Sequence, residues 1–214
     1  TVDVGSDQST LLNFEDIFGS AQADSITGDA ANNVIHGGAG GDTLDGGLGN
    51  DALYGGDGDD TIKYSGGADT IDGGADSDYV SFEEVTSTGI DLDLANNTVD
   101  VGANQSTLLN LENIFGTAQA DDIAGDAMDN IIQGGDGADT LSGDAGDDRI
   151  YGGADADLIS GDDGVDTLYG DSGADTLSGD DGDDKIYGGA DSDLISGDKG
   201  ADALYGDDGN DTLE

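Results

Sequence analysis

Aspartate recurs at every ninth residue along much of this sequence, each time after a glycine-rich stretch. From Gly134 to the last residue the chain divides without a gap into GGDGADTLS, GDAGDDRIY, GGADADLIS, GDDGVDTLY, GDSGADTLS, GDDGDDKIY, GGADSDLIS, GDKGADALY and GDDGNDTLE. Position one is nearly always Gly, position six is Asp or, in weaker units, Asn, and position eight is Leu, Ile or Val. Carboxylates repeated at a constant interval are candidate ligands for a hard cation, which binds oxygen.

The same spacing predicts the elements that position these carboxylates. The first six residues favour turns, because Gly and Asp tolerate the positive φ angles of tight turns. The last three alternate outward, inward and outward, as in a short strand. One buried residue cannot stabilise such a unit, so we expect two units to form a coil, with successive coils stacked as parallel strands about 4.8 Å apart. The expected interior is the row of position-eight side chains Ile114, Ile123, Ile132, Leu141, Ile150, Ile159, Leu168, Leu177, Ile186, Ile195, Leu204 and Leu213.

Stacked coils would bring the carboxylates together in pairs, for example Asp139 with Asp157 and Asp148 with Asp166. Two neighbouring carboxylates repel each other unless a cation lies between them. A site made of carboxylate and carbonyl oxygens favours Ca²⁺ over Zn²⁺. Counting the stacked pairs predicts roughly seven calcium sites in the second half of the chain and two to four in the first.

These nonapeptides resemble the RTX, or hemolysin-type, calcium-binding repeat G-G-x-G-x-D-x-U-x, in which U is a large aliphatic residue. The resemblance covers about 20 units and most of the chain. It implies an all-β fold, a right-handed parallel β-roll, that binds several Ca²⁺ ions. It also implies that the backbone carbonyls of positions two and four join the position-six carboxylates as ligands.

The predicted ligands therefore fall into three classes. The position-six carboxylates are those of Asp42, Asp51, Asp60, Asp69, Asp78, Asp139, Asp148, Asp157, Asp166, Asp175, Asp184, Asp193, Asp202 and Asp211. The position-two residues are Gly38, Gly47, Gly56, Gly74, Gly135, Asp144, Gly153, Asp162, Asp171, Asp180, Gly189, Asp198 and Asp207. The position-four residues are Gly40, Gly49, Gly58, Asp76, Gly137, Gly146, Asp155, Gly164, Gly173, Gly182, Asp191, Gly200 and Gly209. The units holding Asn33, Asn130 and Asp69 depart most from the pattern and are the weakest candidates.

A longer duplication sets the expected domain organisation. Residues 1–55 align without gaps on 98–152. We therefore expect two tandem rolls, 1–81 and 107–214, joined by 82–106. Because both ends of the chain fall inside the repeat pattern, we also expect it to be a piece of a longer tandem protein.

The joining segment has its own pattern. Ile90, Leu92 and Leu94 alternate with polar residues, Asn96-Asn97 is a turn signal, and Val99 and Val101 alternate again. This predicts a hairpin of two amphipathic strands. The apolar stretches at 11–18 and 107–115 are expected to cap the two rolls, since terminal repeats require atypical sequences.

Composition excludes several classes of function. The 50 acidic residues against 4 basic ones give a net charge of −46, which would repel nucleic-acid phosphates. No apolar run is long enough to span a membrane. The absence of Cys excludes disulfides, thiolate metal sites and a Cys nucleophile. A disordered acidic segment is the remaining alternative, and the regular aliphatic position eight argues against it.

Outward positions offer further candidates. Tyr151, Tyr169, Tyr187 and Tyr205 recur at position nine and should form a ladder. We favour aromatic stacking that stiffens the sheet, with a strip that binds sugar or another partner as the alternative. Leu158 and Leu194 also point outward and could mark a contact surface. The one His, His36, also lies at an outward position, and no Ser-His-Asp set, P-loop or zinc motif is present, so no enzyme is expected.

The sequence thus predicts a non-catalytic calcium-binding module of a secreted bacterial protein, which folds on Ca²⁺ binding outside the cell. The resemblance implies type I secretion of an unfolded chain. The alternative is a stalk, adhesive or carbohydrate-binding segment of a large surface adhesin or a secreted enzyme. The expected partners are calcium ions and, through the parent protein, a polysaccharide or cell-surface component.

Overall fold

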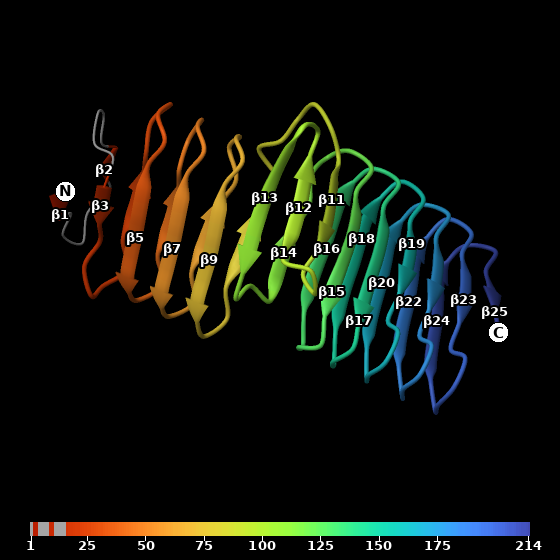
Figure 1. Cartoon of the computed structure of the whole chain (residues 1–214). Helices are drawn as coiled ribbons and strands as arrows, with labels where there is room; N and C mark the ends of the chain where they lie inside the picture. The colour runs from red at the N-terminus through yellow and green to blue at the C-terminus, as the bar shows by residue number, and fades with distance from the viewer. Residues whose placement is uncertain (1, 4–8, 11–15) are drawn as a thin grey trace. The chain divides into compact units, whose positions relative to one another are not determined.

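The protein is an all-β chain in the computed structural model, which describes residues 2–3, 9–10 and 16–214. These residues form 25 strands and no helix. It follows that no helix in the described part of the chain could cross a membrane. The strands stack side by side with their turns in register, as Figure 1 shows for each part of the chain. The expected parallel β-solenoid is confirmed.

Two compact units make up the structure. Unit 1 is Thr1–Val85 with Asn97–Asn113, and unit 2 is Thr86–Asn96 with Ile114–Glu214. The expected boundaries were at 81 and 107. In the structure, residues 107–109 pair with the strand Thr70–Ala75 of unit 1, and residues 91–93 pair with the strand Asp122–Asp126 of unit 2.

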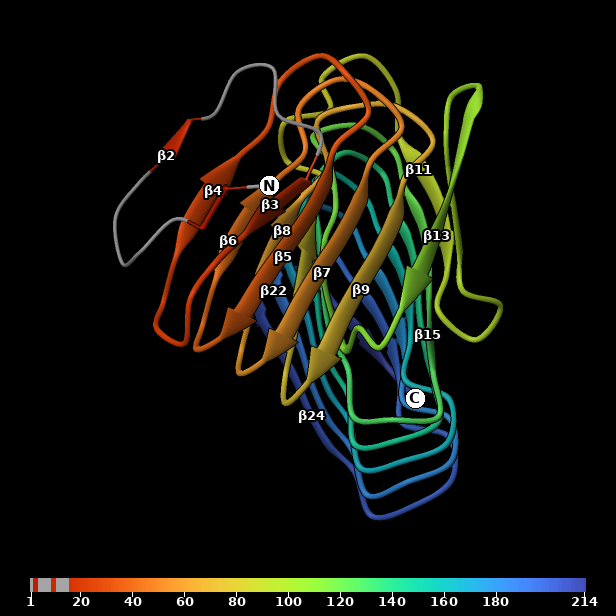
Figure 2. The same ribbon diagram turned by 60° about the vertical axis from the view of Figure 1, so that its left-hand side comes forward.

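Unit 1 has two sheets, which Figure 2 shows as two layers joined by turns. The order of strands in one sheet is β1 (Val2–Asp3), β3 (Asp16–Phe18), β5 (Val34–Ala39), β7 (Ala52–Asp57), β9 (Thr70–Ala75), β13 (Asn104–Leu109) and β12 (Thr98–Val101). The order in the other is β2 (Ser9–Thr10), β4 (Ser25–Thr27), β6 (Thr43–Asp45), β8 (Thr61–Lys63) and β10 (Tyr79–Ser81).

Unit 2 repeats this plan. One sheet runs β11 (Ile90–Asp93), β15 (Asp122–Asp126), β17 (Thr140–Asp144), β19 (Leu158–Ser160), β21 (Thr176–Ser178), β23 (Leu194–Ser196) and β25 (Thr212–Leu213). The other contains β16 (Ile131–Asp136), β18 (Arg149–Ala154), β20 (Thr167–Ser172), β22 (Lys185–Ala190) and β24 (Ala203–Asp208). The short strand β14 (Asn113–Phe115) lies where the two units meet along the chain.

The core is a row of aliphatic side chains on each sheet, joined in unit 1 by the buried rings of Tyr64 and Phe82. Strands pair in parallel with partners 18 residues apart, so that Leu141 lies beside Ile159 and Ile159 beside Leu177. The expected interior residues from Ile114 to Ile195 are all at most 1% exposed. Leu204 is only half-buried and Leu213 is 46% exposed, because no coil of this chain packs beyond them.

The segment between the halves forms both expected strands, β11 and β12, with the turn residue Asn97 at a φ of 59°. β12 pairs antiparallel with β13 through the turn at Gly102. The predicted cap at 107–115 begins inside β13, where Leu108 lies beside Ile71 of β9. This stretch therefore covers the last coil of unit 1 instead of capping the second roll. Residues 11–15 of the other predicted cap lie outside the described residues.

Candidate metal-binding turns

The position-six aspartates form two buried columns in each unit. Asp139, Asp157 and Asp175 belong to one column of unit 2, and each is at most 3% exposed. Oδ1 of each accepts the backbone N–H of the aspartate one coil earlier, at 2.9 Å for both Asp139 to Asp157 and Asp157 to Asp175. Stacking thus brings together the carboxylates that the sequence predicted to be neighbours.

The second oxygen of these carboxylates has no protein partner. In the part of the chain that the structure describes, one side-chain oxygen is buried without a hydrogen bond in Asp24, Asp42, Asp51, Asp60, Asp78, Asp139, Asp148, Asp157, Asp166, Asp175, Asp184 and Asp193. A buried charged oxygen without a partner is costly unless a proton or a cation neutralises it. The columns are therefore arrays of anionic oxygens that a cation would stabilise.

Burial also changes the acidity of these groups. Loss of solvation raises the pKa of Asp148 and Asp157 to about 7, against a usual value of 3.8. The same cause raises the pKa of Asp139 and Asp175 to about 6. In each case the backbone N–H bond opposes the shift and neighbouring carboxylates increase it. Without a bound cation, these carboxyls hold protons more tightly than exposed ones do.

Position-one glycine is required for space, and not for its φ angle as turn chemistry suggested. The glycines at position one, such as Gly134, Gly152 and Gly170, do not have a positive φ. A Cβ on Gly152 would collide with Oδ2 of Asp157 in the same nonapeptide and would lie 2.9 Å from the carbonyl oxygen of Gly170. Because glycine has only a hydrogen there, a carboxylate oxygen and a carbonyl oxygen of the next coil can occupy this space, which we call the cradle.

Many residues at positions two and four have the positive φ that the sequence predicted. Nine aspartates at these positions, Asp76, Asp144, Asp155, Asp162, Asp171, Asp180, Asp191, Asp198 and Asp207, have φ angles from 57° to 82°. Asp tolerates this region better than most residues do. The substitutions of Gly by Asp are therefore conservative for the backbone.

Carbonyl oxygens of these positions point toward the turn of the next coil. A Cβ on Gly189 would collide with the carbonyl oxygen of Asp171, at position two of the previous coil. A Cβ on Gly173 would collide with the carbonyl of Asp155, at position four, and would lie 3.0 Å from Oδ1 of Asp175. Some position-two carbonyls also accept a backbone N–H, as that of Asp144 does from Asp163 at 2.9 Å.

The donor set is one of carboxylates and backbone carbonyls together. No three His, Asp or Glu side chains among the described residues converge as a metal site. The turns therefore offer carboxylate oxygens together with backbone carbonyl oxygens as candidate ligands. Such an all-oxygen set fits Ca²⁺, which takes six to eight oxygen ligands with flexible geometry.

Three nonapeptides, those of Asn33, Asn130 and Asp69, depart from the pattern, as expected from their sequences. The side-chain oxygens of Asn33 and Asn130 accept backbone N–H groups of Asp29 and Asp126, each at 2.9 Å. Neither these residues nor Asp69 has a buried oxygen without a partner. With Asn at position six, the side-chain oxygen of the turn is therefore hydrogen-bonded by protein groups alone.

The sequence pattern missed the groups that end a column. In unit 1, Oε2 of Glu112 accepts the N–H of Asp78 at 3.0 Å, and Oγ of Ser106 accepts that of Asp69 at 2.9 Å. In unit 2, Oδ1 of Asp121 accepts the N–H of Ile90 at 2.8 Å. At the end of a column, these bonds take the place of the bond to an aspartate of a neighbouring coil. Their sequence separations differ from 18, so the pairing expected between coils gave no signal for them.

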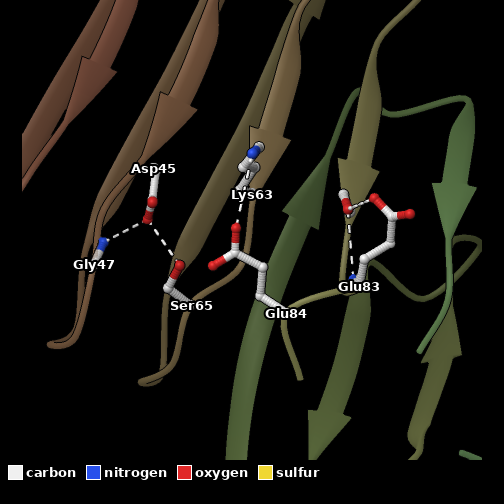
Figure 3. Close-up of polar contacts among 7 residues, drawn as sticks. Asp45, Gly47, Lys63, Ser65, Glu83 and Glu84 are labelled. Atoms are coloured by element: carbon white, nitrogen blue, oxygen red, sulfur yellow. Dashed lines mark hydrogen bonds and ion pairs between the residues drawn. The ribbon is translucent and has the colours of Figure 1, made fainter. Parts of the chain in front are cut away.

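Polar contacts on the outside of the turns were also missed. Oδ1 of Asp45 accepts hydrogen bonds from the N–H of Gly47 at 2.9 Å and from the hydroxyl of Ser65 at 2.8 Å (Figure 3). In unit 2 the hydroxyl of Ser160 donates to Asp180 at 2.6 Å, which joins successive coils.

The tyrosine ladder forms as expected, and unit 1 has an aromatic stack that was not predicted. Tyr151, Tyr169, Tyr187 and Tyr205 stack with ring centroids 4.7, 5.0 and 4.8 Å apart. In unit 1 the His36 ring lies between those of Phe18 and Tyr54, at 4.7 Å from each. His36 is thus a member of an aromatic stack.

Comparison with known proteins identifies the repeat. The model of the RTX calcium-binding nonapeptide repeat (4 copies) matches residues 14–44, 28–62, 36–71, 54–83, 115–150, 125–159, 142–177, 160–195 and 178–213. No curated protein matches the chain. Among solved structures, the extracellular lipase LipA from Serratia marcescens is 16% identical with a TM-score of 0.31, over 92% of this chain and 34% of that one. This chain thus spans about a third of that lipase. From the family matches, which cover most of its length, the chain belongs to the RTX calcium-binding nonapeptide repeat family, whose repeats bind several calcium ions.

Proposed function

We propose that this chain is a non-catalytic module of a secreted protein that folds when it binds Ca²⁺ outside the cell. The observation that carries the proposal is the set of buried carboxylate oxygens without a protein partner, repeated from coil to coil. An array of this kind is unfavourable in a folded chain until cations occupy it. The proposal accounts for a net charge of −46 in a chain with a fully buried aliphatic core.

The ligands we propose are those of the three predicted classes. Each ion would lie between the turns of neighbouring coils and take carboxylate oxygens from position six with carbonyl oxygens from positions two and four. The carbonyls directed at the next coil and the cradle beside each position-one glycine support this arrangement. The turns with Asn33 and Asn130 are satisfied by protein groups, so we propose that they hold no ion.

Calcium binding would be coupled to folding. In the unfolded chain the carboxylates are solvated and far apart, whereas in the folded chain they are buried in columns. The binding energy of the ions therefore becomes folding energy. Extracellular calcium modules bind in the range of about 10⁻⁴–10⁻³ M, which is above cytosolic calcium. The chain would remain unfolded inside the cell, as secretion of an unfolded chain requires.

A calcium titration followed by far-UV circular dichroism tests this proposal. We expect a disordered spectrum in a calcium-free buffer and a cooperative change to a β-sheet spectrum at millimolar Ca²⁺. Magnesium is the control, because it demands a tight octahedral site and retains its waters. A β-sheet spectrum that is complete without calcium and unchanged by it would contradict calcium-dependent folding.

A further inference from the structure

The tyrosine ladder of unit 2 holds four phenols in contact with one another. Tyr151, Tyr169, Tyr187 and Tyr205 are the third residues of β18, β20, β22 and β24, and they lie opposite each other where these strands pair. Neighbouring rings are within 12° of parallel, and their centroids are at most 5.0 Å apart. Each of the two inner rings therefore has another phenol on both of its faces.

The chemistry that adjacent phenols share is one-electron oxidation. The chain has no Cys and no Trp, the other side chains that readily lose one electron, so a one-electron oxidant acts mainly on its tyrosines. A phenol that loses one electron and one proton becomes a phenoxyl radical, with much of its unpaired spin on the ring carbons next to the carbon that bears the oxygen. Two such radicals couple through these carbons and form dityrosine.

The ladder places the reacting carbons close together. Nearly parallel rings on paired strands hold equivalent ring carbons at about the spacing of the strands, which is about 4.8 Å. Rotation of the side chains can bring two ring edges into contact, because the rings lie on an outer face of the sheet, where Tyr205 is 44% exposed and the other three are partly exposed. Reacting groups held in this way couple far more readily than free ones do.

The other three tyrosines, all in unit 1, are placed differently. Tyr64 is only 2% exposed, Tyr54 stacks on His36, and Tyr79 lies beside Thr61 of the adjacent strand. Coupling between two molecules is opposed by repulsion, because each chain has a net charge of −46. Oxidation is therefore directed to neighbouring rings of the ladder within one molecule.

We infer that the tyrosine ladder is an oxidative cross-linking site, at which a peroxidase acting with hydrogen peroxide joins neighbouring rings as dityrosine. Each cross-link forms one carbon–carbon bond between two rings and releases two protons and two electrons. These reduce one hydrogen peroxide to two waters, so the reaction is balanced. The inference rests on the proposed function, because the ladder exists only in the folded chain.

A cross-link would hold two coils together without calcium. Tyr169 and Tyr187 are paired residues on neighbouring strands, so a bond between their rings closes a loop of one coil. A closed loop restricts the unfolded chain and thereby stabilises the folded one. We therefore expect the cross-linked module to need less calcium to fold.

Peptide mapping of the oxidised protein tests the inference. The chain in millimolar calcium is treated with a peroxidase and a limiting amount of hydrogen peroxide, and the monomer is isolated by size-exclusion chromatography. Trypsin in a calcium-free buffer then cuts after the four basic residues. The last three tyrosines of the ladder fall on separate peptides, which are 150–185, 186–199 and 200–214. Mass spectrometry detects pairs joined with the loss of two hydrogens, and dityrosine fluorescence measures the yield.

Two double variants separate the ladder from the other tyrosines. Tyr169→Phe with Tyr187→Phe keeps all four rings and leaves the two outer tyrosines three strands apart, or about 14 Å. The matched control, Tyr54→Phe with Tyr79→Phe, removes the same number of phenols from unit 1. Circular dichroism in calcium confirms that each variant is folded before it is oxidised.

We expect the unchanged protein and the control to give the pairs 150–185 with 186–199 and 186–199 with 200–214, and the ladder variant to give neither. Without calcium, the yield of dityrosine in the monomer should fall at least about tenfold, because the rings are no longer held together. The calcium midpoint of the cross-linked protein should be roughly twofold lower than that of the untreated protein, because the closed loop stabilises the fold.

Three outcomes would overturn the inference. They are a folded protein that gives no joined peptides, a control that loses them as the ladder variant does, and an equal yield from a calcium-free sample whose circular dichroism shows disorder. An unchanged calcium midpoint would contradict the stabilising effect of the cross-link. A calcium-induced transition without cross-linking contradicts only the ladder, whereas a β-sheet spectrum that is complete without calcium contradicts only the proposed function.

Discussion

Each position-six aspartate places its two oxygens in different surroundings. In Asp157, Oδ1 accepts the N–H of Asp139, whereas Oδ2 is buried without a protein partner. The first oxygen fixes the register between coils and the second is free to bind a cation. One residue type thus serves both the backbone and the proposed metal site, which is why Asn replaces it only in turns that protein groups satisfy.

The change Asp157→Asn separates these two roles. The amide oxygen can still accept the N–H of Asp139, and the buried charge is gone. We expect more β-structure without calcium, because an uncompensated buried group costs about 1–3 kcal/mol or more when charged. We also expect fewer bound ions and a calcium midpoint at higher concentration. Circular dichroism and calorimetric titration measure both effects.

The matched control is Asp147→Asn, which removes a charge from the exposed position five of a neighbouring turn. It should leave the number of bound ions unchanged, because Oδ1 of Asp147 accepts the N–H of Val165 outside the buried column. An Asp157→Asn protein that binds as many ions, with the same midpoint, would show that this carboxylate is not a ligand.

At the scale of the strand, the core is only one buried side chain deep on each sheet. The three-residue strands β19, β21 and β23 each bury one side chain, and the coils on either side enclose it. Each buried aliphatic residue therefore lies beside the aliphatic residues 18 positions before and after it. The stability of a coil depends on each of these residues.

Leu168→Ala and Leu158→Ala form a matched pair for this point. Leu168 is fully buried in β20 and Leu158 is 52% exposed on β19. We expect Leu168→Ala to lower the free energy of unfolding by about 2–5 kcal/mol in saturating calcium, because it leaves a cavity. Leu158→Ala should change it by about 0.5 kcal/mol or less. Urea unfolding measures both, and equal effects would contradict the packing described for the strand.

Over the whole molecule, repulsion among carboxylates is the main force that opposes folding. Burial raises the pKa of many carboxyls, to about 7 for Asp78 and Asp148 and to about 6 for Asp60 and Asp166. In the unfolded chain the same groups have the usual value of 3.8. Between these values the calcium-free folded chain binds more protons than the unfolded chain does. Its stability is therefore greatest below about pH 4 and is lost as the pH rises through about 7.

We therefore expect more β-structure at pH 5 than at pH 8 when calcium is absent. The lower limit avoids precipitation near the isoelectric point of about 4.1. With saturating calcium the difference should disappear, and the calcium midpoint should rise at low pH because protons compete with the ions. Circular dichroism of metal-stripped samples across this range checks the expectation. A calcium-free spectrum that is most ordered at pH 8 would reverse the sign and contradict the burial of these carboxyls.

Much of this structure follows from the nonapeptide itself. The turn at positions one to six, the inward position-eight residue and the pairing 18 residues apart are local and repeat in every unit, so pattern alone predicts them. The irregular parts were not predictable in this way. Glu112 and Ser106 complete the columns of unit 1 at sequence separations that the 18-residue pairing does not predict, and only the folded chain brings them to Asp78 and Asp69.

The sequence by itself determined the repeat, the stacked coils, the row of buried aliphatic residues and the choice of an oxygen-binding cation, because each depends on residues that recur at constant spacing. Only the tertiary structure decided which oxygens lack a partner, why position one must be glycine, and that β12 and β13 complete unit 1. These features depend on contacts between different coils, and such contacts are fixed only when the coils stack.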